Sequence, residues 1–118
     1  MEPVILCVDD EATALMIRKL VLEQAGFRVI PASNAQQALE ILNAGPVDLV
    51  LSDHVMPEIT GAALAAMVKR LQPATPFLLL SGVNDLPPGA EAADGFMSKL
   101  EGPEAMIVKV RALLNRSM

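Results

Sequence analysis

The chain has 118 residues, of which 53% are hydrophobic, so it is long enough for one domain over residues 1–118 with a single buried core. Its 14 Asp and Glu outweigh 9 Lys and Arg, giving a net charge of −5, and no basic run offers a surface for direct binding of nucleic acid. No apolar run approaches the roughly 18 residues of a membrane helix, and the N-terminal Met-Glu-Pro lacks the basic start of a signal peptide, so we expect a cytoplasmic protein that does not bind membranes.

The first apolar run, residues 4–8, is short and contains valine and isoleucine, which is typical of a central parallel strand buried on both faces. Cys7 lies inside this run without a second cysteine to pair with, and we interpret it as a small core residue. Residues 12–25 then follow a helical repeat, and Gly26 is expected to end that helix. The predicted inward face of the helix consists of Ala14, Ile17, Val21 and Ala25.

The second strand and the second helix come next, with a capping signal between them. Residues 27–32 have the composition of a strand. Ser33 and Gln36 have the spacing of a capping box, in which two side chains satisfy free backbone N–H groups at the start of a helix. We therefore expect a helix to begin there and to end before Gly45 and Pro46.

The third apolar run, residues 47–52, stops at Asp53, so a carboxylate stands where a buried strand gives way to a loop. Gly61 opens the next helix, and Pro73 ends it. The i, i+3, i+4, i+7 pattern predicts that this helix packs through Leu64, Met67, Val68 and Leu71.

Two further strands and a helix complete the chain. Residues 77–80 form an apolar run that is followed by Ser81, and the short run 95–98 is followed by Lys99. Pro103 is expected to begin the last helix. Its predicted inward residues are Met106, Val110, Leu113 and Leu114.

The strand and helix patterns alternate, which predicts a doubly wound, right-handed parallel sheet of five strands. Ligands bind such sheets beyond the carboxyl ends of the strands. Those ends carry Asp9, Asp10, Asp53, Ser81 and Lys99. Two unit charges about 4 Å apart repel by roughly 4 kcal/mol at an effective dielectric near 20, so the three acids require a cation.

These residues resemble the motifs of the receiver domain of two-component response regulators, and the resemblance covers essentially the whole chain. The motifs are an acidic pair after the first strand, Asp53 in Asp-x-x-Met-Pro followed by Gly61, Ser81 with Gly82 after the fourth strand, and Lys99 after the fifth. The resemblance implies a flavodoxin-like fold of the receiver type. It also implies phosphorelay signalling, in which a sensor histidine kinase or phosphotransfer protein supplies a phosphoryl group and a downstream effector domain or protein responds.

The resemblance further implies a role for each site residue. Asp53 would accept the phosphoryl group, and Mg²⁺ would be held by Asp9, Asp10, one oxygen of Asp53 and the backbone carbonyl of Val55. The remaining phosphoryl oxygens would be taken by Lys99 and Ser81, and the conformational switch would pair Ser81 with Phe96. Such a domain assists its own phosphorylation and dephosphorylation and is not otherwise an enzyme.

The sequence departs from the family pattern at two places. Lys99 is followed by Leu100 where receivers usually have proline, so we expect a trans peptide bond there. Residues 82–95, where receivers have a fourth helix, contain two prolines and a glycine, so we expect a shortened or irregular fourth helix with at most a short turn over residues 88–93. Because this region usually forms the output and dimerisation surface of receivers, we expect signalling or pairing through another surface or through a mobile loop there, and a homodimer stays open.

Two alternatives remain at this stage. A phosphorylation-independent, receiver-like interaction module would share the fold, and the unusual segment and Leu100 favour it. A small hydrolase would use Asp53 with His54, the one histidine of the chain, as its acid or base. We interpret His54 instead as a solvent-facing side chain.

Overall fold

The computed structural model describes residues 2–82, 87 and 89–117. Within these residues, helices and strands alternate as the sequence pattern predicts. The strands are β1 (Val4–Val8), β2 (Arg28–Ala32), β3 (Leu49–Asp53), β4 (Phe77–Ser81) and β5 (Gly95–Ser98). The helices are α1 (Ala12–Gln24), α2 (Ala35–Ala44), α3 (Gly61–Leu71), the 3₁₀ helix η1 (Ala90–Ala92) and α4 (Pro103–Ser117).

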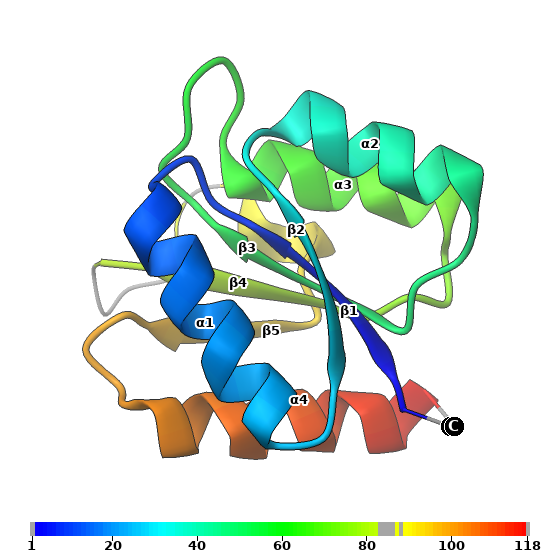
Figure 1. Ribbon diagram of the computed structural model, residues 1–118. Helices are drawn as coiled ribbons and strands as arrows, with labels where there is room; N and C mark the ends of the chain where they lie inside the picture. Colours follow the sequence, from blue (N-terminus) through cyan, green and yellow to red (C-terminus); the bar gives the residue numbers. More distant parts are fainter. Residues whose placement is uncertain (1, 83–86, 88, 118) are drawn as a thin grey trace.

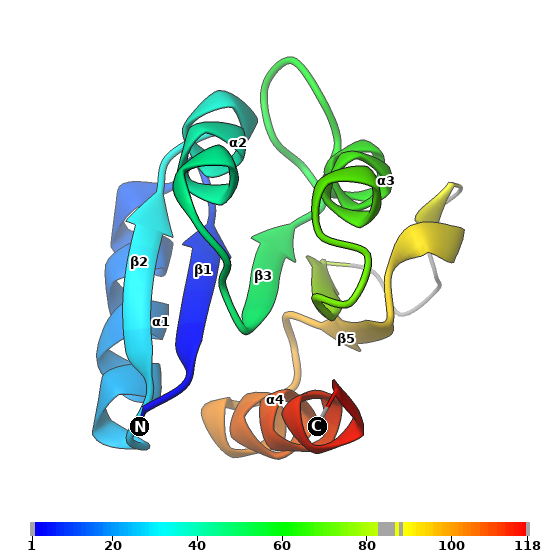
Figure 2. The ribbon, with the colours of Figure 1, turned by 90° about the vertical axis from the view of Figure 1, so that its right-hand side faces the viewer.

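The strands form one parallel sheet in the order β2-β1-β3-β4-β5. Helices α1 and α4 cover one face of this sheet, and α2 and α3 cover the other (Figures 1 and 2). This arrangement confirms the predicted doubly wound fold. Both faces are covered, so the central strands are buried on both sides, which explains why their sequences are continuously apolar.

Alternate residues of each strand enter different halves of the core, because successive side chains of a strand point to opposite faces. Leu6 and Val50 pack toward α2 and α3, whereas Ile5, Cys7 and Leu51 pack toward α1 and α4. Cys7 is fully buried, as expected. The predicted inward residues of α4 are all buried as well.

The predicted packing faces of α1 and α3 need correction. In α1 the buried residues are Leu15 and Leu22, while Ile17 is 55% exposed. This helix is apolar on several sides, so residue spacing alone did not distinguish its core face from its outer face. In α3 the buried residues include Leu64 and Val68 as predicted, but the other two residues of the predicted stripe are 40% and 44% exposed, namely Met67 and Leu71.

The capping box of α2 lies one residue later than predicted. Asn34 is the N-cap, and its side chain accepts a hydrogen bond of 2.8 Å from the Gln37 backbone N–H. The Gln37 side chain in turn accepts one of 2.7 Å from the Ser33 N–H. Asn34 is still extended, with φ −160° and ψ 172°, so the helix begins only at Ala35.

The segment between β4 and β5 contains η1 as its one helical turn among the described residues, which confirms a shortened fourth helix. Residues 83–86 and 88, which the predicted irregular segment includes, lie outside the described residues. After η1, Asp94 attaches the chain to the sheet and to α3. Its carboxylate accepts a 2.7 Å hydrogen bond from the Phe77 N–H and forms an ion pair with Lys69.

The helices that the structure describes include none with the length and apolar character needed to span a bilayer.

Candidate functional site

Three carboxylates meet at the carboxyl ends of β1 and β3. Asp53 is the last residue of β3, and Asp9 and Asp10 directly follow β1. The two strands are parallel neighbours, with Val8 opposite Ser52, so their ends coincide. One oxygen from each carboxylate lies within 4.8 Å of the others. Asp9 and Asp53 are almost fully buried, at 1% and 3% exposure, while Asp10 is exposed.

Lys99 brings a positive charge to this acidic cluster from the end of β5. Its Nζ lies 2.8 Å from Oδ1 of Asp53, and its side chain is 37% exposed. The Lys99 backbone N–H donates a 2.7 Å hydrogen bond to the carbonyl of Ser81, which fixes the loop after β5 beside the end of β4. Oδ1 of Asp53 has no well-directed hydrogen bond within the part of the chain that the structure describes, so the contact is an ion pair.

Arg18 brings a second positive charge, which sequence reasoning missed. Its guanidinium reaches from α1 to Oδ2 of Asp9, and its side chain is only 14% exposed. The other oxygen of Asp9 accepts a 2.9 Å hydrogen bond from the Glu11 N–H. The apolar pattern of the helix offered no signal for this contact between two charged side chains.

The donor set of the cluster suits a hard divalent cation. Asp9, Asp10 and Asp53 supply carboxylate oxygens at close range, which is what Mg²⁺ prefers. Three negative charges face the two positive charges of Arg18 and Lys99, so the described side chains leave one unit of negative charge uncompensated. Each of the three acids lies where the sequence prediction put it.

The remaining predicted site residues lie around this cluster. Ser81 is buried at the end of β4, in register with Ser98 of β5. Phe96 is half-buried in β5 and packs against the core between the sheet and α3. Val55 lies in the loop after β3, and its side chain is 70% exposed. The structure therefore brings Ser81 to the same sheet edge as Asp53, with Phe96 on the adjacent strand.

Gly61 lets α3 begin directly against the end of β3. A Cβ atom on Gly61 would lie 2.6 Å from Cδ1 of Leu79 and 2.9 Å from Cα of His54, and closer still to the carbonyl oxygen of Asp53. The Gly61 N–H donates a 2.8 Å hydrogen bond to the His54 carbonyl. Glycine is needed here because the backbones approach too closely for a side chain.

His54 is not the solvent-facing side chain that the sequence reading expected. It is half-buried, and among the described residues its Nδ1 is buried without a hydrogen-bond partner. Its backbone N–H donates a 2.8 Å hydrogen bond to the Leu80 carbonyl. The close start of α3 at Gly61 explains the difference, because the helix covers part of the residue after Asp53.

The chain after Lys99 is held by a tight turn without proline. Cis peptide bonds are absent from the described residues, so the bond between Lys99 and Leu100 is trans, as expected. Ser98 closes the turn: its Oγ accepts a 3.1 Å hydrogen bond from the Leu100 N–H, and its N–H donates a 3.0 Å hydrogen bond to the Glu101 carboxylate. This backbone hydrogen bond, followed by contact with Lys109, lowers the pKa of Glu101.

Cys7 lies beneath the site but lacks nucleophilic character. Burial raises the pKa of its thiol to about 12, against a smaller opposing effect of Arg18. The thiolate, which is the reactive form, is therefore scarce at neutral pH.

Comparison with known proteins identifies the family. The family model of the response regulator receiver domain matches residues 5–111. The chain belongs to this family. Among curated proteins, this receiver domain is 30% identical over 117 residues to the transcriptional regulatory protein GlrR of Escherichia coli, and 31% identical over 117 residues to the alkaline phosphatase synthesis transcriptional regulatory protein PhoP of Bacillus subtilis. Both alignments cover 96% of the chain.

A second kind of relative is a sensor protein. The autoinducer 1 sensor kinase/phosphatase LuxN of Vibrio harveyi is 36% identical over 80 residues, or 68% of the receiver domain. The chain spans 9% of the length of LuxN, 26% of GlrR and 49% of PhoP. Receiver domains of this kind thus occur as parts of longer proteins of both classes.

Solved structures agree with the fold and with the family. The response regulator protein TrrA of Thermotoga maritima, solved in complex with Mg²⁺-BeF, has a TM-score of 0.89 at 29% identity, with 96% of this chain and 99% of that chain covered. A response regulator receiver domain protein from Clostridium thermocellum has a TM-score of 0.88 at 28% identity, with 97% of this chain and 95% of that chain covered. The receiver fold is therefore retained despite the short η1 segment.

Proposed function

We propose that this receiver domain, as a single unit over residues 1–118, accepts a phosphoryl group on Asp53 in a Mg²⁺-dependent reaction. The observation that carries the proposal is the position of Asp53: a buried carboxylate at the end of a central strand, beside two further acids and in contact with Lys99. A carboxylate oxygen is a competent acceptor for phosphoryl transfer. The donor is a phosphohistidine on a sensor histidine kinase or a phosphotransfer protein.

In the transfer, an oxygen of Asp53 forms a bond to phosphorus while the bond from phosphorus to the donor nitrogen breaks. Bound Mg²⁺ supplies charge neutralisation and would be held by Asp9, Asp10, Asp53 and the backbone carbonyl of Val55. The Lys99 ammonium exchanges its contact with Oδ1 of Asp53 for a phosphoryl oxygen. Phosphoryl transfer depends mainly on positioning and charge stabilisation, which these groups provide.

The proposed switch couples this chemistry to the outer surface through Ser81 and Phe96. The Ser81 hydroxyl moves toward a phosphoryl oxygen, and the Phe96 ring turns further inward into the space released. Two observations support this: Ser81 is buried at the sheet edge beside Asp53, and Phe96 on the adjacent strand is only half-buried. A downstream effector domain or protein reads the changed surface.

The surface next to the site suits a protein partner. Met16, Ile17 and Leu20 of α1 are exposed by 64%, 55% and 53%. Adjacent exposed apolar side chains of this kind commonly mark an interaction surface. These three lie on the helix that also carries Arg18. We assign this face to the phosphoryl donor. The domain acts in the cytoplasm as a signalling module that assists its own phosphorylation, without turnover of a separate substrate.

The test is intact-protein mass spectrometry after incubation with acetyl phosphate, with and without Mg²⁺. The wild-type protein should gain one phosphoryl adduct only with Mg²⁺, and the isosteric variant Asp53→Asn should gain none. Asp48→Asn is the matched control, because Asp48 is an exposed acid before the start of β3, at the opposite end from the site. Absence of an adduct on folded wild-type protein would instead support the phosphorylation-independent interaction module.

A further inference from the structure

Asp9 differs from the other two acids because both of its carboxylate oxygens are already engaged. Oδ1 accepts the hydrogen bond from the Glu11 N–H at the start of α1, and Oδ2 contacts the Arg18 guanidinium. Asp10 is exposed and forms no ion pair within the described residues. A metal ion that takes Asp9 as a ligand must therefore approach a carboxylate that already has a cation beside it.

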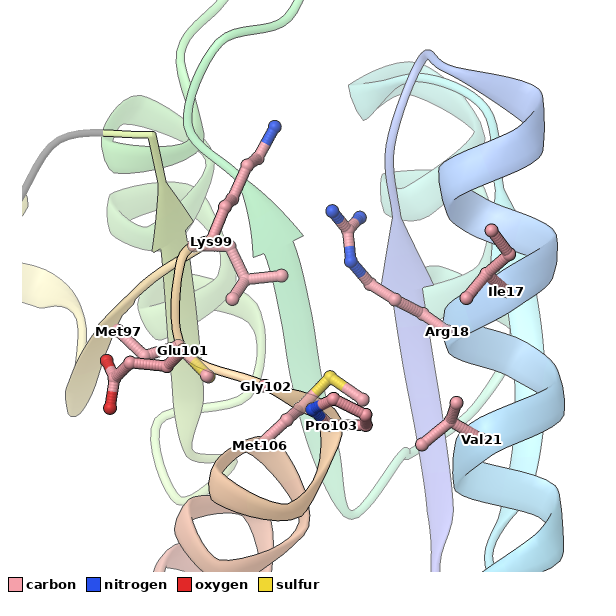
Figure 3. A pocket seen from close by; sticks show the side chains of 10 residues that line it. Ile17, Arg18, Val21, Met97, Lys99, Glu101, Gly102, Pro103 and Met106 are labelled. Carbon is pink, nitrogen blue, oxygen red and sulfur yellow. The ribbon is translucent and has the colours of Figure 1, made fainter.

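Arg18 shares its surroundings with several apolar side chains. Together with Val21, Leu80, Met97 and Met106 it lines a pocket of about 150 Å³ between α1 and the loop after β5. Figure 3 shows Arg18 extending from α1 toward the same end of the sheet as Lys99, with Val21 and Met106 below it. Arginine commonly packs its methylene stem on apolar surface while its charged head reaches a polar partner.

We propose that Arg18 acts as a built-in competitor of the metal: it holds Asp9 in the metal-free protein, leaves Oδ2 when Mg²⁺ binds, and thereby sets the metal affinity of the site. The inference rests on the proposed metal site and adds a positioning residue to it. Arg18 does not contact the reacting atoms of Asp53; it acts through Asp9.

The charges of the cluster give the direction of the effect. The three acids with Arg18 and Lys99 carry a net charge of −1, and a divalent ion would change this to +1 if Arg18 stayed in place. Without the Arg18 charge the same acids with Lys99 carry −2, which a divalent ion neutralises. A neighbouring unit positive charge repels a divalent ion twice as strongly as a monovalent one, so removal of Arg18 should tighten Mg²⁺ binding by about tenfold or more.

The decisive experiment is calorimetric titration of Mg²⁺ into wild-type protein, Arg18→Met and Arg18→Gln. Methionine keeps a long apolar stem that fits the pocket, and glutamine keeps a hydrogen-bond donor without the charge. Arg28→Met is the matched control, because Arg28 is an exposed arginine at the start of β2, the opposite end of the sheet from the site. Both Arg18 variants should bind Mg²⁺ at least about tenfold more tightly than the control. Their thermal stability should fall without metal and recover at saturating Mg²⁺.

A second measurement uses the wild-type protein alone, so it does not depend on the folding of a variant. The side-chain N–H signal of Arg18 in a nitrogen-edited NMR spectrum should change as Mg²⁺ fills the site. An unmoved signal at saturation, or Arg18 variants that bind Mg²⁺ as weakly as Arg28→Met, would overturn the role of Arg18 while leaving the metal site intact. Failure of all four proteins to bind Mg²⁺ would reject the metal site together with this inference.

Discussion

Replacement of Gly61 by alanine tests whether the close start of α3 against β3 is required. The added Cβ would lie 2.9 Å from Cα of His54 and 2.6 Å from Cδ1 of Leu79, and still nearer to the Asp53 carbonyl. Normal carbon contacts begin near 3.5 Å, so the start of α3 must move away by at least about 0.6 Å. Two of the three obstructing atoms belong to the backbone of β3 and its following residue, which cannot rotate out of the way.

Overpacking of this kind costs about 1–3 kcal/mol, and we expect the upper half of that range for Gly61→Ala because backbone must shift. The midpoint of urea unfolding should fall by about 1 to 2 M. Far-UV circular dichroism is the suitable signal, because the chain has no Trp or Tyr. Gly45→Ala is the control, since a Cβ there would meet nothing within 4 Å. A Gly61→Ala midpoint equal to that of Gly45→Ala would refute the steric argument.

Three further predictions concern Cys7 and Asp94, which lie outside the acidic cluster. Burial raises the pKa of Cys7 from 9.0 to about 12. Iodoacetamide near pH 8 should therefore leave the folded protein unmodified but should modify the protein unfolded in urea. Rapid labelling of the native state would contradict this. The folded thiol holds its proton more tightly than the unfolded one, so its contribution to stability is intact below pH 9.0 and is lost as the pH rises toward 12; Cys7→Ala should remove that pH-dependent part in unfolding experiments. Asp94→Ala should lower the free energy of unfolding by about 1–2 kcal/mol, because the Phe77 N–H loses its acceptor and Lys69 loses its ion pair. Asp94→Asn keeps an acceptor for the Phe77 N–H, so it should lower the free energy of unfolding by less. Equal losses for the two variants in urea unfolding would argue against the hydrogen bond.

The convergence of Asp53, Ser81 and Lys99 could be predicted because it depends on topology alone. Parallel strands bring their carboxyl ends to one sheet edge, and apolar runs mark where each strand stops. The short η1 segment was equally accessible, since two prolines and a glycine exclude a full helix. The ends of the apolar runs decided the first prediction and the prolines decided the second, and no competing sequence pattern was present in either case.

The contact of Arg18 with Asp9 could not be predicted, because it depends on which side of α1 faces the sheet. Leu15 and Leu22 fit one apolar stripe and Ile17 fits another, and only the packing of the whole domain selects between these faces. The half-buried state of His54 has a similar origin. It follows from the close start of α3 beside His54, which the pattern of apolar residues does not encode.

The two positive charges at the acidic cluster come from distant parts of the chain. Arg18 belongs to the first helix, while Lys99 follows the last strand of the sheet. During synthesis the three acids and Arg18 are therefore present well before the ammonium that contacts Asp53. A nascent or C-terminally truncated chain can hold its acidic cluster but has an incomplete set of charges around it. The full set of charges around the acidic cluster is therefore present only after the fifth strand and Lys99 have been made.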